Sequence, residues 1–513
     1  MDSRTKAILA VISGLLLFLS FPKYGDGAVI WLALVPLLYA LRESNLKSGF
    51  ITGFITGFIF NIGILYWVGL VVLNYGHLPL AVGLLATLCL AAYLGIYVSL
   101  FAGGVVYFRN RGLSPLIAAP LLWTSLEYVK SHALTGFPWE NLAYSQYKYG
   151  QIIQIADVTG IYGLTFAILF INALLYDLLI NLTEGSDAGR IKRLIKDGAG
   201  LVICFLFLNI YGIISLADIE ANLQKAPPFE VSLVQGNIDQ SVKWHPDYQQ
   251  KTLNVYGSLS KLFSPPPAGL IIWPETAVPF YFQDGSEKSR EVVKVAKGSE
   301  NWLLFGSPSY RQENNSLSFY NSAFLLSPAG VITGRYDKVH LVPYGEYVPL
   351  RRYFRFVKKL VEGPGDFRKG DGYYPLAMNN RQVGVLICYE GIFPEYSRRY
   401  RNMGVDMLVN ITNDAWFGRT SAPYQHLSMT VFRAVENRLY VLRAANTGIS
   451  AIIEPTGKVI AQTDLFVPTA LQGRVRFIDR KTHYMAYGDV FVYICMILLL
   501  ALFFISRRGA HKC

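Results

Sequence analysis

Residues 383–390 read VGVLICYE, a short apolar run with a cysteine, Cys388, at its end. Five apolar residues in a row are typical of a strand that is buried on both faces. Similar runs recur between residues 229 and 480, and segments with helical spacing, 248–261 and 428–439, lie between some of them. This alternation predicts an α/β domain with buried strands.

Turn sequences mark two of the connections in this domain. SPAG at 327–330 and EPTG at 454–457 each separate two apolar runs, so both predict hairpins. The predicted strands cover residues 231–234, 270–273, 302–305, 323–326, 383–387, 407–411, 440–443 and 449–453.

The composition of the whole chain indicates a membrane protein. Of the 513 residues, 52% are hydrophobic and 16% are charged, against about 25% charged in soluble domains, and the mean hydropathy is +0.32. A hydrocarbon core of ~30 Å needs about 20 apolar residues per helix. We expect eight spans, at residues 6–21, 27–41, 50–73, 79–107, 114–131, 160–181, 198–216 and 489–506.

Basic residues between the spans predict the orientation. The net charge of +12 does not indicate nucleic-acid binding, because Lys and Arg cluster in alternate short loops, which is the pattern of cytoplasmic loops. The first apolar run lacks a small-residue cleavage site and is interpreted as an uncleaved anchor. The cytoplasmic clusters are Arg4, Lys6, Arg42, Lys47, Arg109, Arg111, Arg190, Lys192, Arg193, Lys196, Arg507 and Arg508.

This orientation divides the chain into three parts. Residues 1–216 form a bundle of seven spans, 217–488 a folded domain outside the cytoplasm, and 489–513 a final span and tail, with both termini cytoplasmic. Few ionisable residues lie within the spans, whereas a transporter usually carries more of them at mid-depth. The bundle is therefore interpreted as a platform.

Cys388 is the only one of the five cysteines in the outer domain. Thiols outside the cytoplasm tend to pair, so an unpaired one needs a reason. One reason is packing, since a lone cysteine often acts as a small hydrophobe. The other is catalysis. A thiol at a strand end, close to a helix that begins near Phe393, has its thiolate favoured by the helix dipole.

Two charged residues follow other predicted strands. Glu275 comes after LIIWP at 270–274, and Lys338 after a hairpin strand. A carboxylate can take up and return a thiol proton, and an ammonium can stabilise the oxyanion of a tetrahedral intermediate. Taken alone, each of these residues is more typical of an ordinary surface charge than of a catalytic group. Together with the single thiol they form a Glu-Lys-Cys constellation.

Short motifs around these residues carry a family resemblance. WPE at 273–275, YDKVHLVP at 336–343 and ICYE at 387–390 resemble the three signatures of the nitrilase superfamily. The arrangement of spans resembles the apolipoprotein N-acyltransferases of bacterial inner membranes. So do four further motifs: GFPW at 136–139, VQGNI at 234–238, YGEYVP at 344–349 and NDAWFG at 413–418.

The resemblance implies a fold and a reaction. The fold is an α-β-β-α sandwich on the periplasmic side of the inner membrane. Cys388 attacks the sn-1 ester of a phospholipid, with Glu275 as general base and Lys338 at the oxyanion, and a thioester forms. The α-amine of the N-terminal diacylglyceryl-cysteine of a lipoprotein then takes the acyl chain. No metal or cofactor is expected, because no metal-ligand cluster or phosphate loop occurs in the sequence.

Five further residues are candidates by position. Glu346 either hydrogen-bonds Lys338 or is a surface carboxylate. Glu390 either orients Lys338 or is an N-terminal helix charge. Tyr389 and Trp416 line an acyl pocket, support the oxyanion hole or pack in the core. Trp244 is either a gate near the membrane or an interfacial anchor. Residues 344–375 also contain a basic amphipathic segment, which is either a lid in the headgroup layer or a solvated basic helix.

Two other functions compete with acyl transfer. A membrane-tethered amidase or nitrilase would use the same three residues, although a hydrolase of soluble amides gains little from eight spans. A transporter or receptor with a ligand-binding outer domain is the second, and the sparse charges within the spans argue against it.

Overall fold

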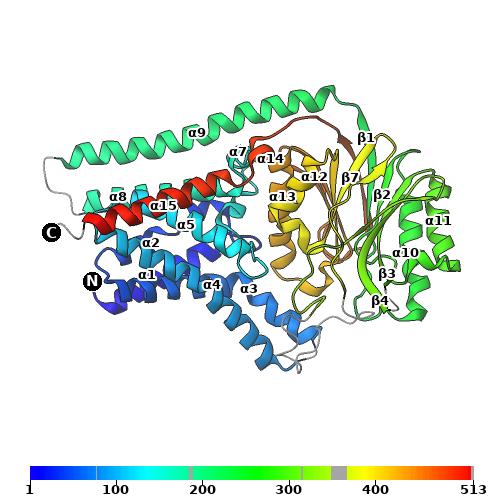
Figure 1. Cartoon of the computed structure of the whole chain (residues 1–513), viewed down its shortest axis with the longest axis horizontal. Coiled ribbons are helices and arrows are strands. Elements are labelled where there is room, and N and C mark those ends of the chain that lie inside the picture. Colours follow the sequence, from blue (N-terminus) through cyan, green and yellow to red (C-terminus); the bar gives the residue numbers. More distant parts are fainter. Residues whose placement is uncertain (77, 184–188, 314–315, 348–366, 510–513) are drawn as a thin grey trace. The chain divides into compact units, whose positions relative to one another are not determined.

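The computed structural model describes residues 1–76, 78–183, 189–313, 316–347 and 367–509. The chain forms two compact units (Figure 1). One comprises Met1–Leu73, Leu78–Ala217 and Tyr487–Cys513, and the other comprises Asn74–His77 and Asp218–Ala486.

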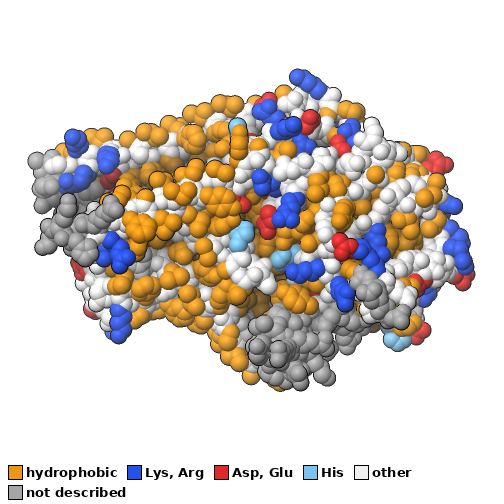
Figure 2. All heavy atoms as spheres, viewed as in Figure 1, with side chains coloured by type: hydrophobic (Ala, Val, Ile, Leu, Met, Phe, Trp, Pro, Cys, Tyr) orange, Lys and Arg blue, Asp and Glu red, His pale blue; other side chains and the backbone are white. Residues whose placement is uncertain are grey.

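The first unit is helical. Its α-helices are α1 (Ser3–Phe18), α2 (Val35–Leu41), α3 (Leu46–Asn74), α4 (Leu80–Arg109), α5 (Pro115–His132), α6 (Gly150–Ile153), α7 (Ala156–Thr159), α8 (Ile161–Thr183), α9 (Arg190–Lys225) and α15 (Val490–Gly509). Within the described residues, α3, α4, α8, α9 and α15 are long and apolar enough to cross a membrane. Hydrophobic side chains cover much of the visible face of these helices (Figure 2).

The other three predicted spans do not combine the length and hydropathy of these five helices. Helix α1 has 16 residues, α5 carries Pro120, Glu127 and Lys130 in its 18 residues, and residues 27–41 divide into a 3-10 turn, Gly27–Trp31, and the short α2. The expectation of eight spans therefore stays a prediction, since hydropathy and length support five within the described residues.

The second unit contains two six-stranded sheets. The first has the order β12-β1-β2-β3-β4-β5 and the second β11-β10-β9-β8-β7-β6. The strands are β1 (Pro228–Gln235), β2 (Leu270–Ile272), β3 (Trp302–Glu313), β4 (Ser316–Leu326), β5 (Ile332–Asp337), β6 (Leu376–Met378), β7 (Arg381–Ile387), β8 (Met407–Thr412), β9 (Tyr440–Ala445), β10 (Ala451–Ile453), β11 (Val459–Gln462) and β12 (Thr469–Arg476). All eight predicted runs overlap these strands, and both predicted hairpins, β4–β5 and β10–β11, are confirmed.

Helices cover the outer faces of the two sheets (Figure 1). Helices α10 (Pro246–Leu262) and α11 (Glu287–Ser299) pack on the first sheet, where Tyr256 and Val292 join Trp273, Phe305 and Phe324 in one buried cluster. Helices α12 (Pro394–Asn402) and α13 (Ala422–Asn437) contact β7 and β9 of the second sheet. Because each sheet is covered on both faces, its central strands carry apolar residues in unbroken runs.

Strand direction decides where the functional residues meet. Strands β1, β2 and β3 run parallel, as do β7, β8 and β9. In the first sheet Ile272 pairs with Leu304, Gly306 with Ala323, and Ser322 with Asp337. The end of β2, the middle of β4 and the end of β5 therefore lie at one level.

The core of this unit should be intolerant of cavities. Leu304 on β3 is fully buried, so Leu304→Ala should destabilise the unit by about 2–5 kcal/mol. Leu317→Ala is the control, because Leu317 on β4 is 55% exposed, and it should change stability by less than about 0.5 kcal/mol. The urea midpoint of the near-ultraviolet circular dichroism signal measures both. Equal midpoints for the two variants would contradict the packing.

Candidate active site

The backbone around Glu275 is fixed against strand β3. Gly306 N donates to Pro274 O at 3.2 Å, and Val278 N donates to Gly306 O at 3.1 Å. A Cβ atom on Gly306 would lie 2.7 Å from Glu275 Cα and 2.4 Å from Thr276 N. Only glycine permits this approach, so β3 determines where the turn after β2 lies.

Glu275 is buried, with 7% of the residue exposed, and its carboxylate accepts hydrogen bonds from both halves of the sandwich. Asn321 Nδ2, on β4, donates to its Oε1 at 2.7 Å, and Asn413 N, just after β8, donates to its Oε2 at 2.9 Å. Two donors from different sheets hold the carboxylate in one orientation.

Lys338 follows β5 and is almost completely buried, at 1% exposure. Its Nζ lies 2.9 Å from Glu346 Oε2 and 3.7 Å from Glu275 Oε1, and Asn321 Nδ2 also donates to Glu346 Oε1 at 2.9 Å. Burial lowers the pKa of the ammonium, but the charges of Glu346 and Glu275 outweigh it, so the pKa of Lys338 is raised. Lys338 is therefore a permanent cation between two carboxylates, and Glu346 hydrogen-bonds it directly.

Cys388 ends β7 and opens a 3-10 turn, Cys388–Ile392. Its φ of +53° is a left-handed conformation that few non-glycine residues adopt. Burial and then the charge of Glu275 raise the pKa of its thiol to about 12, although Lys338 and a hydrogen bond with Thr412 oppose the rise. The expectation of a stabilised thiolate was wrong, because burial and the charge of Glu275 outweigh the charge of Lys338.

A buried polar network on β8 and β9 supports the backbone of Cys388. Asn410 Nδ2, on β8, donates to Cys388 O at 3.2 Å, and Arg443 on β9 donates to Asn410 Oδ1 at 2.5 Å and to Asp414 Oδ2 at 2.7 Å. Burial raises the pKa of Asp414, but Arg443 and His426 outweigh it and hold the pKa well below its usual range. Asp414 is thus an ionised partner for Arg443.

Glu390 hydrogen-bonds both the segment that carries Lys338 and the segment that carries Cys388. It is fully buried. Its Oε1 accepts from Tyr336 Oη at 2.9 Å, Val339 N at 2.8 Å and His340 N at 3.0 Å, and its Oε2 accepts from Ile387 N at 2.8 Å. Burial raises its pKa to about 7, and these donors oppose the rise. Glu390 therefore acts on backbone at both strand ends.

The aromatic candidates lie at the margins of this cluster. Tyr389 is half-buried, with its ring 5.6 Å from that of His340. Trp416 is half-buried against the Tyr75 ring at 4.9 Å. Trp244 is half-buried, and its Nε1 has no hydrogen-bond partner within the described part of the chain. Of the predicted lid segment, residues 344–375, the part at 348–366 that includes its basic amphipathic stretch lies outside the described residues.

Sequence reasoning missed Asn321 altogether. Its side chain bridges the two carboxylates, yet it stands inside a strand among Ser, Tyr and Phe, where nothing in the pattern distinguishes it. Asn413 was noted only as part of a motif, and its role uses a backbone N–H that no sequence pattern reports.

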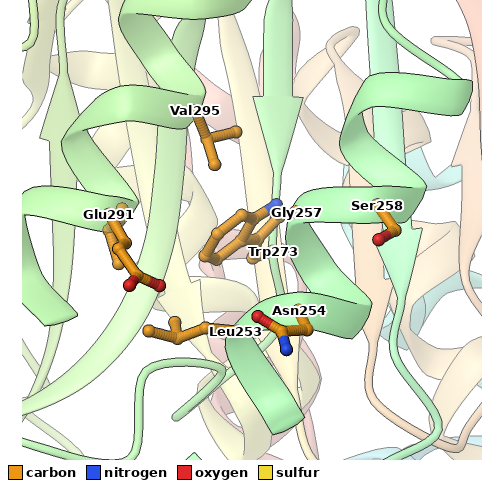
Figure 3. Close-up of a pocket in the computed structure, with 8 residues that line it drawn as sticks. Leu253, Asn254, Gly257, Ser258, Trp273, Glu291 and Val295 are labelled. Atoms are coloured by element: carbon orange, nitrogen blue, oxygen red, sulfur yellow. The ribbon is translucent and has the colours of Figure 1, made fainter. Parts of the chain in front are cut away.

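A separate hollow of about 260 Å³ lies between α10 and α11 (Figure 3). Trp273 lines it together with Leu253, Asn254 and Glu291. Its lining contains none of the candidate catalytic residues, although Trp273 lies two positions before Glu275.

Comparisons with known proteins cover both units. Residues 13–174 match the family described as apolipoprotein N-acyltransferase N-terminal domain, and residues 230–477 match carbon-nitrogen hydrolase. The chain is 44% identical over 494 residues to the apolipoprotein N-acyltransferase of Geobacter metallireducens, covering 96% of this chain and 94% of that one. It is 31% identical over 507 residues to that of Pasteurella multocida, with the same coverage. An amidase structure from Nesterenkonia sp. AN1 aligns at 18% identity and a TM-score of 0.38, covering 52% of this chain and 97% of that one.

Charge around Cys388 predicts how its reactivity depends on pH. Glu275→Gln removes a charge that raises the pKa of the thiol, so the apparent pKa for alkylation by iodoacetamide should fall by about one unit. Lys338→Met should move it upward, because it removes the opposing cation. The rate is measured by mass spectrometry on the peptide that contains Cys388. A fall in both variants, or no change in either, would contradict the electrostatics.

Proposed function

The chain belongs to the apolipoprotein N-acyltransferase family, and on that premise we propose that it transfers the sn-1 acyl chain of a phospholipid to a lipoprotein through a thioester on Cys388. The acceptor is the α-amine of an N-terminal diacylglyceryl-cysteine, and the product is a triacylated lipoprotein. The chain is an N-acyltransferase of lipoproteins. The donor position, the thioester and the roles of individual residues are the proposal.

The observation that carries the mechanism is the position of the Lys338 ammonium, 2.9 Å from Glu346 and 3.7 Å from Glu275. Cys388 Sγ attacks the ester carbonyl carbon while Glu275 accepts the thiol proton, and Lys338 stabilises the oxyanion. The intermediate collapses, the C–O bond breaks, and the departing lysophospholipid oxygen takes the proton from Glu275. Covalent catalysis thereby divides one acyl transfer into two steps.

The second step reverses the roles at the same atoms. The acceptor nitrogen attacks the thioester carbonyl and Glu275 accepts a proton from the amine. The C–S bond then breaks, and the Cys388 thiolate takes that proton from Glu275. The raised pKa of the thiol supports this account, because a thiol that is neutral at rest requires a base within the attacking step.

We assign supporting roles to the remaining candidates. Glu346 holds the Lys338 ammonium, and Glu390 positions the backbone next to Lys338 and Cys388. Tyr389 and Trp416 line the acyl pocket, and Trp244 gates access from the membrane.

The proposed setting is the bacterial inner membrane. Residues 1–216 form seven spans, 217–488 the catalytic domain on the periplasmic side, and 489–513 the eighth span with its tail, with both termini cytoplasmic. Alternating Lys and Arg clusters in the sequence support this topology. The exposed apolar side chains of α9 and α15, such as Ile203 at 66% and Ile497 at 64%, support contact with lipid.

Trapping the acyl-enzyme tests the proposed function. The purified chain is incubated with phospholipid vesicles, and the peptide containing Cys388 is weighed by mass spectrometry. An acyl mass that hydroxylamine removes is expected on Cys388, and it should disappear in Cys388→Ala. Cys495→Ala, which changes a cysteine of α15, should leave it unchanged.

Adding a lipopeptide with an N-terminal diacylglyceryl-cysteine completes the test. The acyl mass should leave Cys388 and appear on the lipopeptide amine. Hydrolysis of simple amides without an acyl group on Cys388 would instead favour the membrane-tethered amidase.

A further inference from the structure

Lys243 is a buried lysine in an otherwise accessible loop. It lies between β1 and α10, and its side chain is fully buried although Ser241 and His245 are exposed. Its Nζ donates to Thr276 Oγ1 at 2.6 Å and to Glu275 O at 3.2 Å. Both acceptors belong to the turn that carries the proposed general base.

Burying this amine costs free energy that its hydrogen bonds must offset. Burial lowers the pKa of Lys243 to about 7, and the charge of Glu275 opposes the fall. A methionine of similar length would occupy the same space without that cost, so packing alone gives no reason for a lysine. The hydrogen bonds from its Nζ to Glu275 O and Thr276 Oγ1 provide a reason for a lysine at this position.

The turn that Lys243 holds is strained. Thr276 has a φ of +49°, and for a β-branched residue this left-handed conformation is a genuine outlier that surrounding contacts must maintain. Gly306 of β3 contacts the turn through Pro274 O and Val278 N. Lys243 secures the turn from a second segment, through Glu275 O and the Thr276 hydroxyl.

The same loop also supports the carboxylate end of Glu275. Asn413 Nδ2 donates to Gln240 Oε1 at 2.5 Å, and Asn413 N is one of the two donors to the Glu275 carboxylate. The loop over residues 236–245 therefore contacts the backbone of the general base directly, through Lys243, and supports its carboxylate indirectly, because Gln240 bonds the side chain of Asn413.

We propose that Lys243 is a positioning residue that holds the strained Glu275–Thr276 turn so that the Glu275 carboxylate faces the Cys388 thiol. The inference rests on the proposed function, since it assigns Lys243 a part in the same acyl transfer. Lys243 touches no reacting atom and acts through Glu275.

The experiment compares Lys243→Met with Lys261→Met in the full-length chain. Lys261 is an exposed lysine in the last turn of α10 and serves as the matched control. Thioester formation on Cys388 is followed in a single turnover with labelled phospholipid vesicles. Lys243→Met should slow it by at least about tenfold, as loss of a charged hydrogen bond implies, and Lys261→Met should match the parent chain.

Variants at Thr276 test the hydrogen bond itself and do not depend on the folding of Lys243→Met. Thr276→Val removes the acceptor and should slow acylation, whereas Thr276→Ser keeps the hydroxyl and should restore most of the rate. The double variant Lys243→Met/Thr276→Val should be no slower than Lys243→Met. Independent, multiplying losses would overturn the proposal.

A second measurement separates positioning from general stability. If Glu275 leaves its place near Cys388, the apparent pKa for alkylation of the thiol should fall toward that of Glu275→Gln. An unchanged alkylation profile in Lys243→Met overturns the inference, and it does so even in a chain that forms no thioester. If the parent chain forms no thioester, that result contradicts the proposed function and leaves the alkylation test of Lys243 in place.

Discussion

The ammonium group of Lys338 is a buried charge, and burial of an unpaired ion costs several kcal/mol. At 1% exposure it has no access to bulk water, so carboxylates must replace the water. Glu346 and Glu275 do so from different segments, and Asn321 donates to both. The turn after β2, the middle of β4, the end of β5 and the loop before residue 348 must therefore meet at one point, which the register of the first sheet allows.

The second sheet contributes the nucleophile and ties it to this cluster. Glu390 bonds the backbone before Cys388 and the backbone after Lys338, while Asn413 donates to Glu275 from the end of β8. A sandwich of two sheets suits such chemistry because Glu275, Lys338 and Cys388 each follow a strand, and strands hold side chains more precisely than loops do. Burial between the sheets also raises the pKa of the Cys388 thiol, so Glu275 must remove the thiol proton during the attack.

The sequence alone predicted those strands and site residues that neighbouring residues in the chain reveal. The apolar runs became strands, and Glu275, Lys338 and Cys388 follow their strands as expected, since a charged residue after an apolar run is visible in the chain. Asn321 and Lys243 were not predicted, because a polar residue inside a strand or loop gains its role only from tertiary contacts. The thiolate expectation failed for a related reason: burial, which raises the pKa of Cys388, cannot be read from neighbouring residues.

The central claim is that one active site performs two separate half-reactions through Cys388. Release of lysophospholipid in the absence of any lipoprotein acceptor measures this most directly. The account predicts a burst of about one lysophospholipid per chain that then stops, because the covalent intermediate must accumulate before an acceptor arrives. Release that occurs only when phospholipid and acceptor are present together would contradict it, since that result requires direct transfer without an acyl-enzyme.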